Sequence, residues 1–180
     1  MSYAPLAAKL VLTVPVAALL TQPLWAPHWG AGILGEIHAL GAAGAAVAVL
    51  AFLALVAAYC RCLQRLLAAI PPAARTASPR SVWWMFAIPY NFVEDFFIVA
   101  AIAASLRNDG RVPPARRRLW RRLGLAWCAL QIVSLLPGAL GVAAGAAALP
   151  AWAAHWILSV RLLRLLGDTA PNTPRATASA

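Results

Sequence analysis

Two adjacent carboxylates, Glu94 and Asp95, are the residues of this 180-residue chain best suited to chemistry, because they lie inside an apolar run. Charged groups in an apolar setting are costly and mark functional sites by default. The run is broken just before them by Pro89, Tyr90 and Asn91. The candidate functional cluster is Trp84, Pro89, Tyr90, Asn91, Glu94 and Asp95.

A structural role for the same residues is the alternative, and the sequence favours it. Asn91 followed three residues later by Glu94 resembles a capping box, with Asn91 as the N-cap of a helix. Asp95 would then lie in the first turn, where a negative charge suits the helix dipole. The carboxylates can also pair with arginines of the neighbouring basic loops. Cation binding or proton relay by Glu94 or Asp95 is the functional alternative.

Histidine and cysteine offer a second kind of chemistry. A membrane cofactor or redox site using His38 and His155 is one hypothesis, because imidazole is the commonest metal ligand. No HExxH or paired i, i+4 arrangement exists, so no cofactor and no metal are predicted. Cys60 and Cys62 lack the further partners that a zinc site needs. With no Gly-rich phosphate loop, nucleophile elbow or Ser-His-Asp pattern, the sequence indicates no catalytic residues and favours a non-enzymatic protein.

Apolar runs are the elements that position these residues. Hydrophobic residues make up 63% of the chain and charged residues 11%, whereas about a quarter of a soluble domain is charged. A bilayer core about 30 Å thick needs about 20 helical residues. The sequence therefore predicts an all-α integral membrane protein, with one transmembrane bundle over 1–167 and a disordered cytoplasmic tail over 168–180. The four predicted spans are 6–25, 37–59, 120–138 and 143–164.

Arginine placement decides whether a further apolar run, 82–106, also crosses. Most of the 15 Lys and Arg residues flank this run on both sides. Because short basic loops stay cytoplasmic, we predict a re-entrant or interfacial helical hairpin, with one short helix before Pro89 and another after Asn91. Five transmembrane helices are the alternative. The hairpin layout predicts a multi-pass protein of the bacterial cytoplasmic (inner) membrane with both termini cytoplasmic.

The basic residues after the hairpin indicate a partner. The net charge of +10 abuts apolar runs of spanning length, which favours anionic lipid headgroups over nucleic acid. The candidate lipid-contacting residues are Arg116, Arg117, Arg118, Arg121 and Arg122. We therefore predict a membrane module whose basic cytoplasmic face binds anionic lipid or an acidic protein partner. A small transporter or ion/proton pathway through the broken helix around Pro89–Asp95 is the alternative.

Small residues and tryptophans indicate how the helices pack. The pairs Gly41/Ala45 and Gly44/Ala48 allow close helix contact. Packing within the bundle is favoured over self-association into a homo-oligomer. Tryptophan favours membrane interfaces, so the eight tryptophans are predicted to be interfacial anchors.

One stretch resembles a known family. Following Arg61 and Arg65, the chain carries in order Ser78-Pro79, Trp83-Trp84, Ile88-Pro89, Asn91 and an apolar run to Ser105-Leu106. Over residues 59–106 this order resembles a bacterial multi-spanning membrane family catalogued as domain of unknown function 4328. The resemblance implies a helical membrane protein and leaves the activity open.

Overall fold

The computed structural model describes residues 4–30 and 37–168, and every regular element within these ranges is a helix. The all-α prediction is confirmed. The predicted tail beyond Asp168 lies outside the described residues. The elements are α1 (Ala4–Leu20), α2 (Gln22–Trp25), η1 (Pro27–Trp29), α4 (Gly41–Ala68), η2 (Pro72–Ala74), η3 (Pro79–Phe86), α5 (Asn91–Asp109), α6 (Pro114–Val133) and α7 (Ala139–Asp168).

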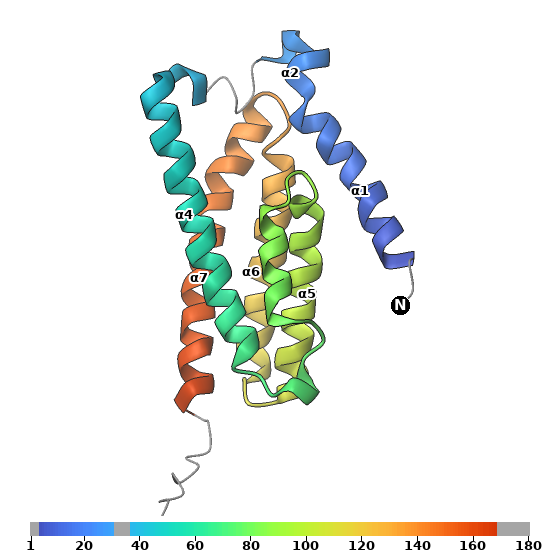
Figure 1. The fold of residues 1–180 in the computed structure, drawn as a ribbon, viewed down its shortest axis with the longest axis vertical. Coiled ribbons are helices and arrows are strands. Elements are labelled where there is room, and N and C mark those ends of the chain that lie inside the picture. Colours follow the sequence, from blue (N-terminus) through green and yellow to red (C-terminus); the bar gives the residue numbers. More distant parts are fainter. Residues whose placement is uncertain (1–3, 31–36, 169–180) are drawn as a thin grey trace, which may run out of the picture.

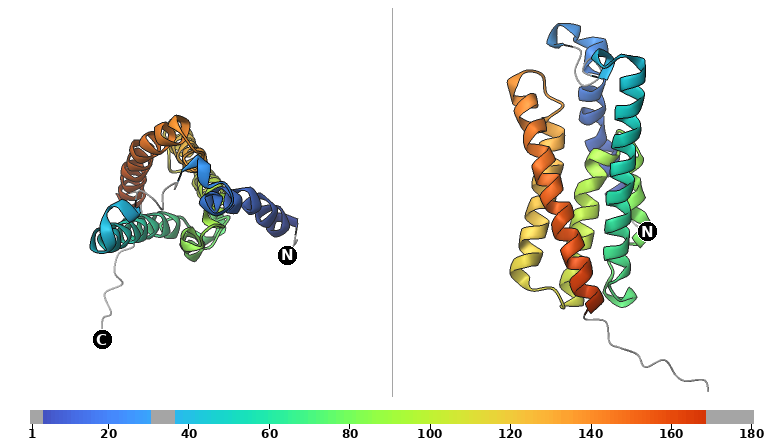
Figure 2. Two further views of the ribbon diagram at one scale, coloured as in Figure 1. Left: turned by 90° about the horizontal axis from the view of Figure 1, so that it is seen from above. Right: turned by 90° about the vertical axis from the view of Figure 1, so that its left-hand side faces the viewer.

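The long helices α4, α5, α6 and α7 run along one common direction (Figure 1). The antiparallel pair α6 and α7 is joined by the turn 134–138, at one end of the bundle. Residues 69–78, residues 110–113 and the last turn of α7 lie at the opposite end, which we call the basic end. Figure 2 shows α1 outside the bundle, where it packs on α5.

The segment from η3 to α5 forms a hairpin that opens at the basic end (Figure 1). η3 ascends beside α4, the chain reverses over residues 87–90, and α5 descends beside α6. The peptide bond before Pro89 is cis. α5 is followed by the C-cap residue Gly110, whose φ of +77° is typical of a left-handed helix C-cap. The two-part shape predicted around Pro89 is therefore present.

The packed core lies in the half of the bundle nearest the basic end. Fully buried side chains there include Leu63, Leu66, Ile102, Trp120 and Leu162. Towards the other end α4 diverges from α7 (Figure 1), and residues 41–58 of α4 are exposed or half-buried. The predicted packing of Gly41/Ala45 and Gly44/Ala48 within the bundle is wrong for this reason: no other described helix covers that stretch of α4.

Two described helices, α4 and α7, are long and apolar enough to cross a membrane, which makes the chain compatible with membrane association. Four such helices, as predicted from the sequence, are not found in the described ranges. α1 has 17 residues and is shorter than a span. The first half of α6 carries arginines, so its apolar part extends only from Leu123 to Val133.

Two arginines of the basic loops have structural roles. Arg75 donates through Nε to the carbonyl oxygen of Ile70 at 2.7 Å, and through Nη2 to that of Ala68 at 2.8 Å. Arg111 donates through Nη2 to the carbonyl oxygen of Ala69 at 2.9 Å. These cations satisfy carbonyls at the end of α4, where the helix dipole favours positive charge.

Candidate functional site

Glu94 is held by two donors, one on α1 and one in the turn before α5. The Nζ of Lys9, on α1, lies 2.6 Å from Glu94 Oε2, and the Tyr90 hydroxyl donates to the same oxygen at 2.9 Å. The Lys9 ammonium also lies 4.5 Å from the centre of the Phe97 ring, a cation–π contact. Glu94 is buried and Lys9 is half-buried. The ion pair is therefore largely shielded, and it fastens α1 to α5.

Asp95, the next residue, has no cation within ion-pair distance in the part of the chain that the structure describes. It is 2% exposed. Its Oδ2 accepts from Gln131 Nε2, on α6, at 3.5 Å, whereas its Oδ1 has no hydrogen-bond partner. Asn91 also has a buried Oδ1 without a partner. Since residues four apart share a helix face, two acceptors without donors lie on one side of α5.

The environment of Asp95 favours its neutral form. Burial raises the pKa of this carboxyl to about 8. The hydrogen bond from Gln131 opposes the rise, and the negative charge of Glu94 adds to it. Burial and the neighbouring carboxylate therefore both favour the protonated carboxyl over the carboxylate.

The predicted capping box is wrong. The N-cap of α5 is Tyr90, which makes no side-chain capping bond, and Asn91 is already the first helical residue. The N–H of Asn91 donates to the Ala87 carbonyl oxygen at 2.8 Å, so this donor needs no cap from Glu94. The predicted pairing of the carboxylates with loop arginines is also wrong, because the cation that Glu94 contacts is Lys9.

The other two predicted members of the cluster lie at its edge. Trp84, on η3, is exposed and meets the Tyr90 ring edge-on, with 6.1 Å between ring centres. Pro89 is half-buried in the turn between η3 and α5. The structure thus brings the six predicted residues to one region of the hairpin, with only Glu94 and Asp95 fully inside.

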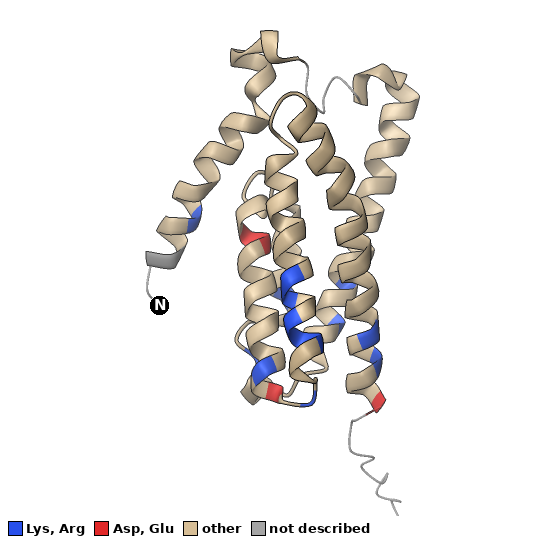
Figure 3. Cartoon of the chain, turned by 180° about the vertical axis from the view of Figure 1, so that it is seen from behind, with Lys and Arg blue, Asp and Glu red and all other residues tan. Residues whose placement is uncertain are grey.

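The predicted lipid-contacting residues all lie on the first half of α6. Figure 3 shows the basic residues of the bundle gathered towards the basic end, whereas the basic residue of α1 lies apart from them. Four of the five are exposed and Arg117 is half-buried. None of the five forms an ion pair with an acid of residues 4–30 or 37–168. Exposed arginines continue onto the neighbouring helices as Arg61, Arg65, Arg161 and Arg164.

The two histidines proposed for a cofactor site do not meet. His38 is exposed just before α4, at the end remote from the basic end, whereas His155 is fully buried within α7. The Nδ1 of His155 lies 2.7 Å from the Tyr59 hydroxyl oxygen, and its Nε2 has no partner. Within the described ranges no group of three His, Cys, Asp or Glu residues could hold a metal ion.

Two of the tryptophans predicted to be interfacial anchors are buried instead. The ring centres of Trp120 and Trp127 lie 4.4 Å and 6.5 Å from that of His155. Trp120 Nε1 donates to Ser159 Oγ at 2.8 Å. With Tyr59, these side chains tie α4, α6 and α7 together. The arrangement is a packed structural network between the three helices.

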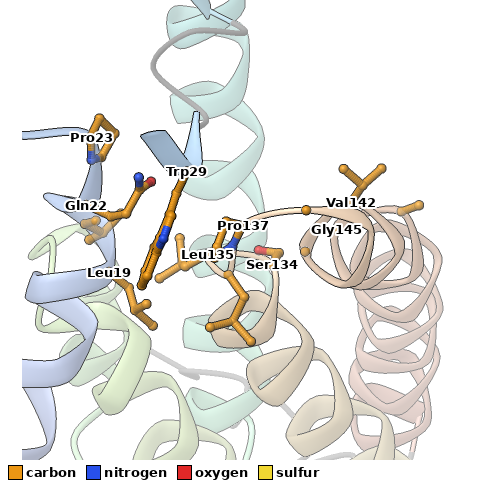
Figure 4. A pocket seen from close by; sticks show the side chains of 14 residues that line it. Leu19, Gln22, Pro23, Trp29, Ser134, Leu135, Pro137, Val142 and Gly145 are labelled. Atoms are coloured by element: carbon orange, nitrogen blue, oxygen red, sulfur yellow. The ribbon is translucent and has the colours of Figure 1, made fainter. Parts of the chain in front are cut away.

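A cavity of about 500 Å³ opens at the end remote from the basic end. Gln22 and Trp29 line one wall, and Ser134 and Pro137 of the α6–α7 turn line the other (Figure 4). The Gln22 amide donates to the Ala26 carbonyl oxygen at 2.6 Å. None of the predicted site residues lines this cavity, so it is separate from the candidate cluster.

Sequence reasoning missed Lys9 and Gln131 as partners of the carboxylates. Lys9 is the lone charge of the first apolar run, and Glu94 and Asp95 are the acids of another. Opposite charges isolated in two apolar runs are expected to pair, and this feature could have identified Lys9. No comparable feature of the sequence marks Gln131.

Comparison of the chain with protein-family models, with curated proteins and with solved structures gives no match. The resemblance over residues 59–106 therefore stays a prediction from its motif.

Proposed function

We propose that the chain is an integral membrane protein in which α4 and α7 cross the bilayer and the basic end lies at the cytoplasmic surface. α4 is free of charge from Gly41 to Cys60, and α7 from Ala139 to Val160. These stretches are about 30 Å and 33 Å long, which matches the hydrocarbon core of a bilayer. Each stretch leads directly into arginine, at Arg61 and Arg161.

Exposed apolar side chains support this placement. On α4, Val47 and Leu50 are 67% and 66% exposed, and on α7 Val142 and Leu149 are 69% and 66% exposed. Moving such a side chain from water into an apolar medium is worth about 1.5–3 kcal/mol. Lipid supplies that medium along both helices, whereas in water so large an apolar surface would drive association.

The other elements follow from the same placement. α6 accompanies α7 through the layer, because the two are antiparallel and their turn lies at the far end. We place η3 and α5 as a hairpin that enters and leaves on the cytoplasmic side, since both of its ends join basic loops. α1 alone is shorter than a span, but α2 follows it after Thr21, and together they extend from Ala4 to Trp25. We place the two together as a fourth crossing, with both termini cytoplasmic and the protein in a bacterial inner membrane. The proposal includes membership of the bacterial membrane family catalogued as domain of unknown function 4328, on the motif in residues 59–106 alone.

In this placement the basic end binds anionic lipid headgroups. The observation that supports this role is that its exposed arginines have no acidic partner among the described residues. Trp120 of α6 is hydrogen-bonded to Ser159 of α7, and Arg121 follows the first of these residues while Arg161 lies two residues after the second. Arginines of α6 and α7 therefore lie at one depth. Each contributes about 1 kcal/mol near an anionic surface. An acidic protein partner would use the same charges, and neither role needs a catalytic group.

An apolar hollow beside two of these arginines fits a lipid chain. The hollow is about 350 Å³ in volume and lies on α7. It is lined by Ala153, Trp156, Ile157, Val160, Arg161 and Arg164. A phospholipid can place its phosphate at the two guanidinium groups and an acyl chain along the apolar residues.

Titration of the detergent-solubilised protein with short-chain phosphatidylglycerol and with phosphatidylcholine tests this role. We expect phosphatidylglycerol to bind more tightly, and added salt to weaken that preference. Replacing Arg121 and Arg122 by Gln removes about 2 kcal/mol, which is roughly 30-fold in affinity. The matched variant with Lys at both positions keeps its charge and its affinity. Equal affinity for both lipids, or no effect of salt, would contradict the proposal.

A small transporter or proton pathway is a second candidate, favoured by the buried carboxylate of Asp95 in a hairpin broken at Pro89. Ion and proton flux into vesicles containing the protein can be compared with flux in the variant Glu94→Gln with Asp95→Asn. Flux that the double substitution abolishes supports transport. Absent flux, or flux that the substitutions leave unchanged, rejects it.

A further inference from the structure

Two buried acceptor oxygens on α5, Asn91 Oδ1 and Asp95 Oδ1, lack a hydrogen-bond donor. Side chains four residues apart on a helix have Cβ atoms about 5–6 Å apart, so these two can reach each other. A buried acceptor without a donor costs about 1–3 kcal/mol, and a charged one costs more. With the Asn91 amide oriented as it is, an ionised Asp95 would leave both oxygens unsatisfied.

The surroundings supply no positive charge to Asp95. The titratable groups that interact with it are Tyr59 and Cys60 on α4, Glu94 on α5 and Cys128 on α6. None of these groups is a cation, and the ammonium of Lys9 on α1 pairs with the neighbouring Glu94 at 2.6 Å. The single charge of Lys9 can therefore compensate only one of the two carboxylates. An ionised Asp95 would leave a buried negative charge uncompensated.

We propose that Asp95 is a proton-binding site, held as a neutral carboxylic acid whose Oδ1–H donates to Asn91 Oδ1 while Oδ2 accepts from Gln131. The proton comes from water and returns to water when the group ionises. A single proton gives both unsatisfied oxygens a hydrogen bond and removes the second negative charge beside Glu94. This site goes beyond lipid binding at the basic end and does not depend on it.

A metal ion fits these residues less well than a proton. Mg²⁺ takes about six oxygen ligands and Ca²⁺ about six to eight, whereas no group of three His, Cys, Asp or Glu residues in the described ranges could hold a metal ion. Asn91 and Gln131 add only two amides beside Asp95. Gln131 lies about 13 Å further along α6 than Arg122, at about 1.5 Å per residue. The contact therefore lies in the apolar half of α6, where a neutral acid is favoured over an ionised one.

Infrared spectroscopy of the full chain in lipid vesicles, in H₂O and in D₂O, tests the proposal. Below about pH 7 we expect the C=O stretching band of a protonated carboxyl, shifted in D₂O. The band is expected to remain in Glu94→Gln and to vanish in Asp95→Asn. A wild-type spectrum without this band, or an Asp95→Asn spectrum that retains it, would overturn the assignment. In the first case the Asn91 amide would instead donate to an ionised Asp95.

Asn91→Leu gives a second readout that does not require removal of the carboxyl. We expect the band to persist and to move to higher frequency, because the acid loses the oxygen to which it donates. An unshifted band would overturn the role of Asn91. Phosphatidylglycerol affinity should be unchanged in Asp95→Asn, so failure of the lipid-binding proposal and failure of this one are separate outcomes.

Discussion

Charged side chains at the basic end differ from those in the interior of the hairpin in exposure and in pairing. At the basic end, arginines such as Arg118 and Arg121 are exposed and have no acidic partner among the described residues. In the interior, Glu94 and Asp95 are buried against α1 and α6. Exposed charges cost little to hold and can bind a headgroup, whereas buried charges must be paired or neutralised. Substitutions should therefore change stability in the interior and lipid affinity at the basic end.

Breaking the Lys9–Glu94 pair should have the largest effect. Lys9→Met leaves a buried carboxylate without its cation, and we expect a loss of about 3 kcal/mol in the free energy of unfolding. Denaturant titration in detergent micelles, followed by tryptophan fluorescence, measures this loss. Adding Glu94→Gln removes the uncompensated charge and should recover most of it. Arg118→Met is the control at the basic end, with an expected change within about 0.5 kcal/mol. Equal losses of unfolding free energy in Lys9→Met and Arg118→Met would contradict the difference between the two regions.

A pair of glycines sharpens the same comparison through packing. At Gly124 an added Cβ would lie 2.7 Å from His155 Nε2 and 2.8 Å from Val99 Cγ1, whereas at Gly167, near the basic end, it meets nothing within 4 Å. Gly124→Ala should destabilise the fold by about 2 kcal/mol. Gly167→Ala should be neutral or slightly stabilising, because alanine is the better helix former. The thermal unfolding midpoints of the two variants measure the difference in stability. An unchanged midpoint in Gly124→Ala would contradict tight packing around this glycine.

The pH dependence of stability should be smaller and should come from the interior. The pKa of Asp95 is raised to about 8 in the folded chain, against about 3.9 in the unfolded chain. Between these values the folded state binds the proton more tightly, so stability falls as pH rises. From pH 6 to pH 7 this amounts to about 1 kcal/mol. Asp95→Asn should flatten the fall in unfolding midpoint, and the same slope in both proteins would contradict the raised pKa.

Local features of the sequence predicted what depends on neighbours along the chain. The helical class, the break at Pro89 and the exposure of most arginines on α6 are of this kind. The capping box failed because the ion pair with Lys9 holds Glu94, and a cap is worth only about 1 kcal/mol. Trp120 carries the residue type of an interfacial anchor, yet its hydrogen bond to Ser159 holds it inside.

Contacts between segments that lie far apart in the chain could not be predicted from such local features. Lys9 and Glu94 meet only because α1 packs on α5, and no periodicity in either helix specifies that neighbour. The predicted count of four spans relied on apolar length and on the placement of arginines, and neither specifies where each helix begins and ends. In the structure, arginines occupy the first half of α6, and α1 is shorter than the apolar run that contains it.

Labelling of single cysteines with a membrane-impermeant thiol reagent tests the placement of the basic end most directly. Cys60, Cys62 and Cys128 are first replaced by alanine, and cysteine is then introduced singly at Ala73, Ala115 or Ala139. Ala73 and Ala115 flank the hairpin at the basic end, and Ala139 begins α7 at the other end. We expect positions 73 and 115 to react from the cytoplasmic side and position 139 from the opposite side. Reaction of positions 73 and 115 from opposite sides would contradict a single basic face and make the hairpin a true crossing.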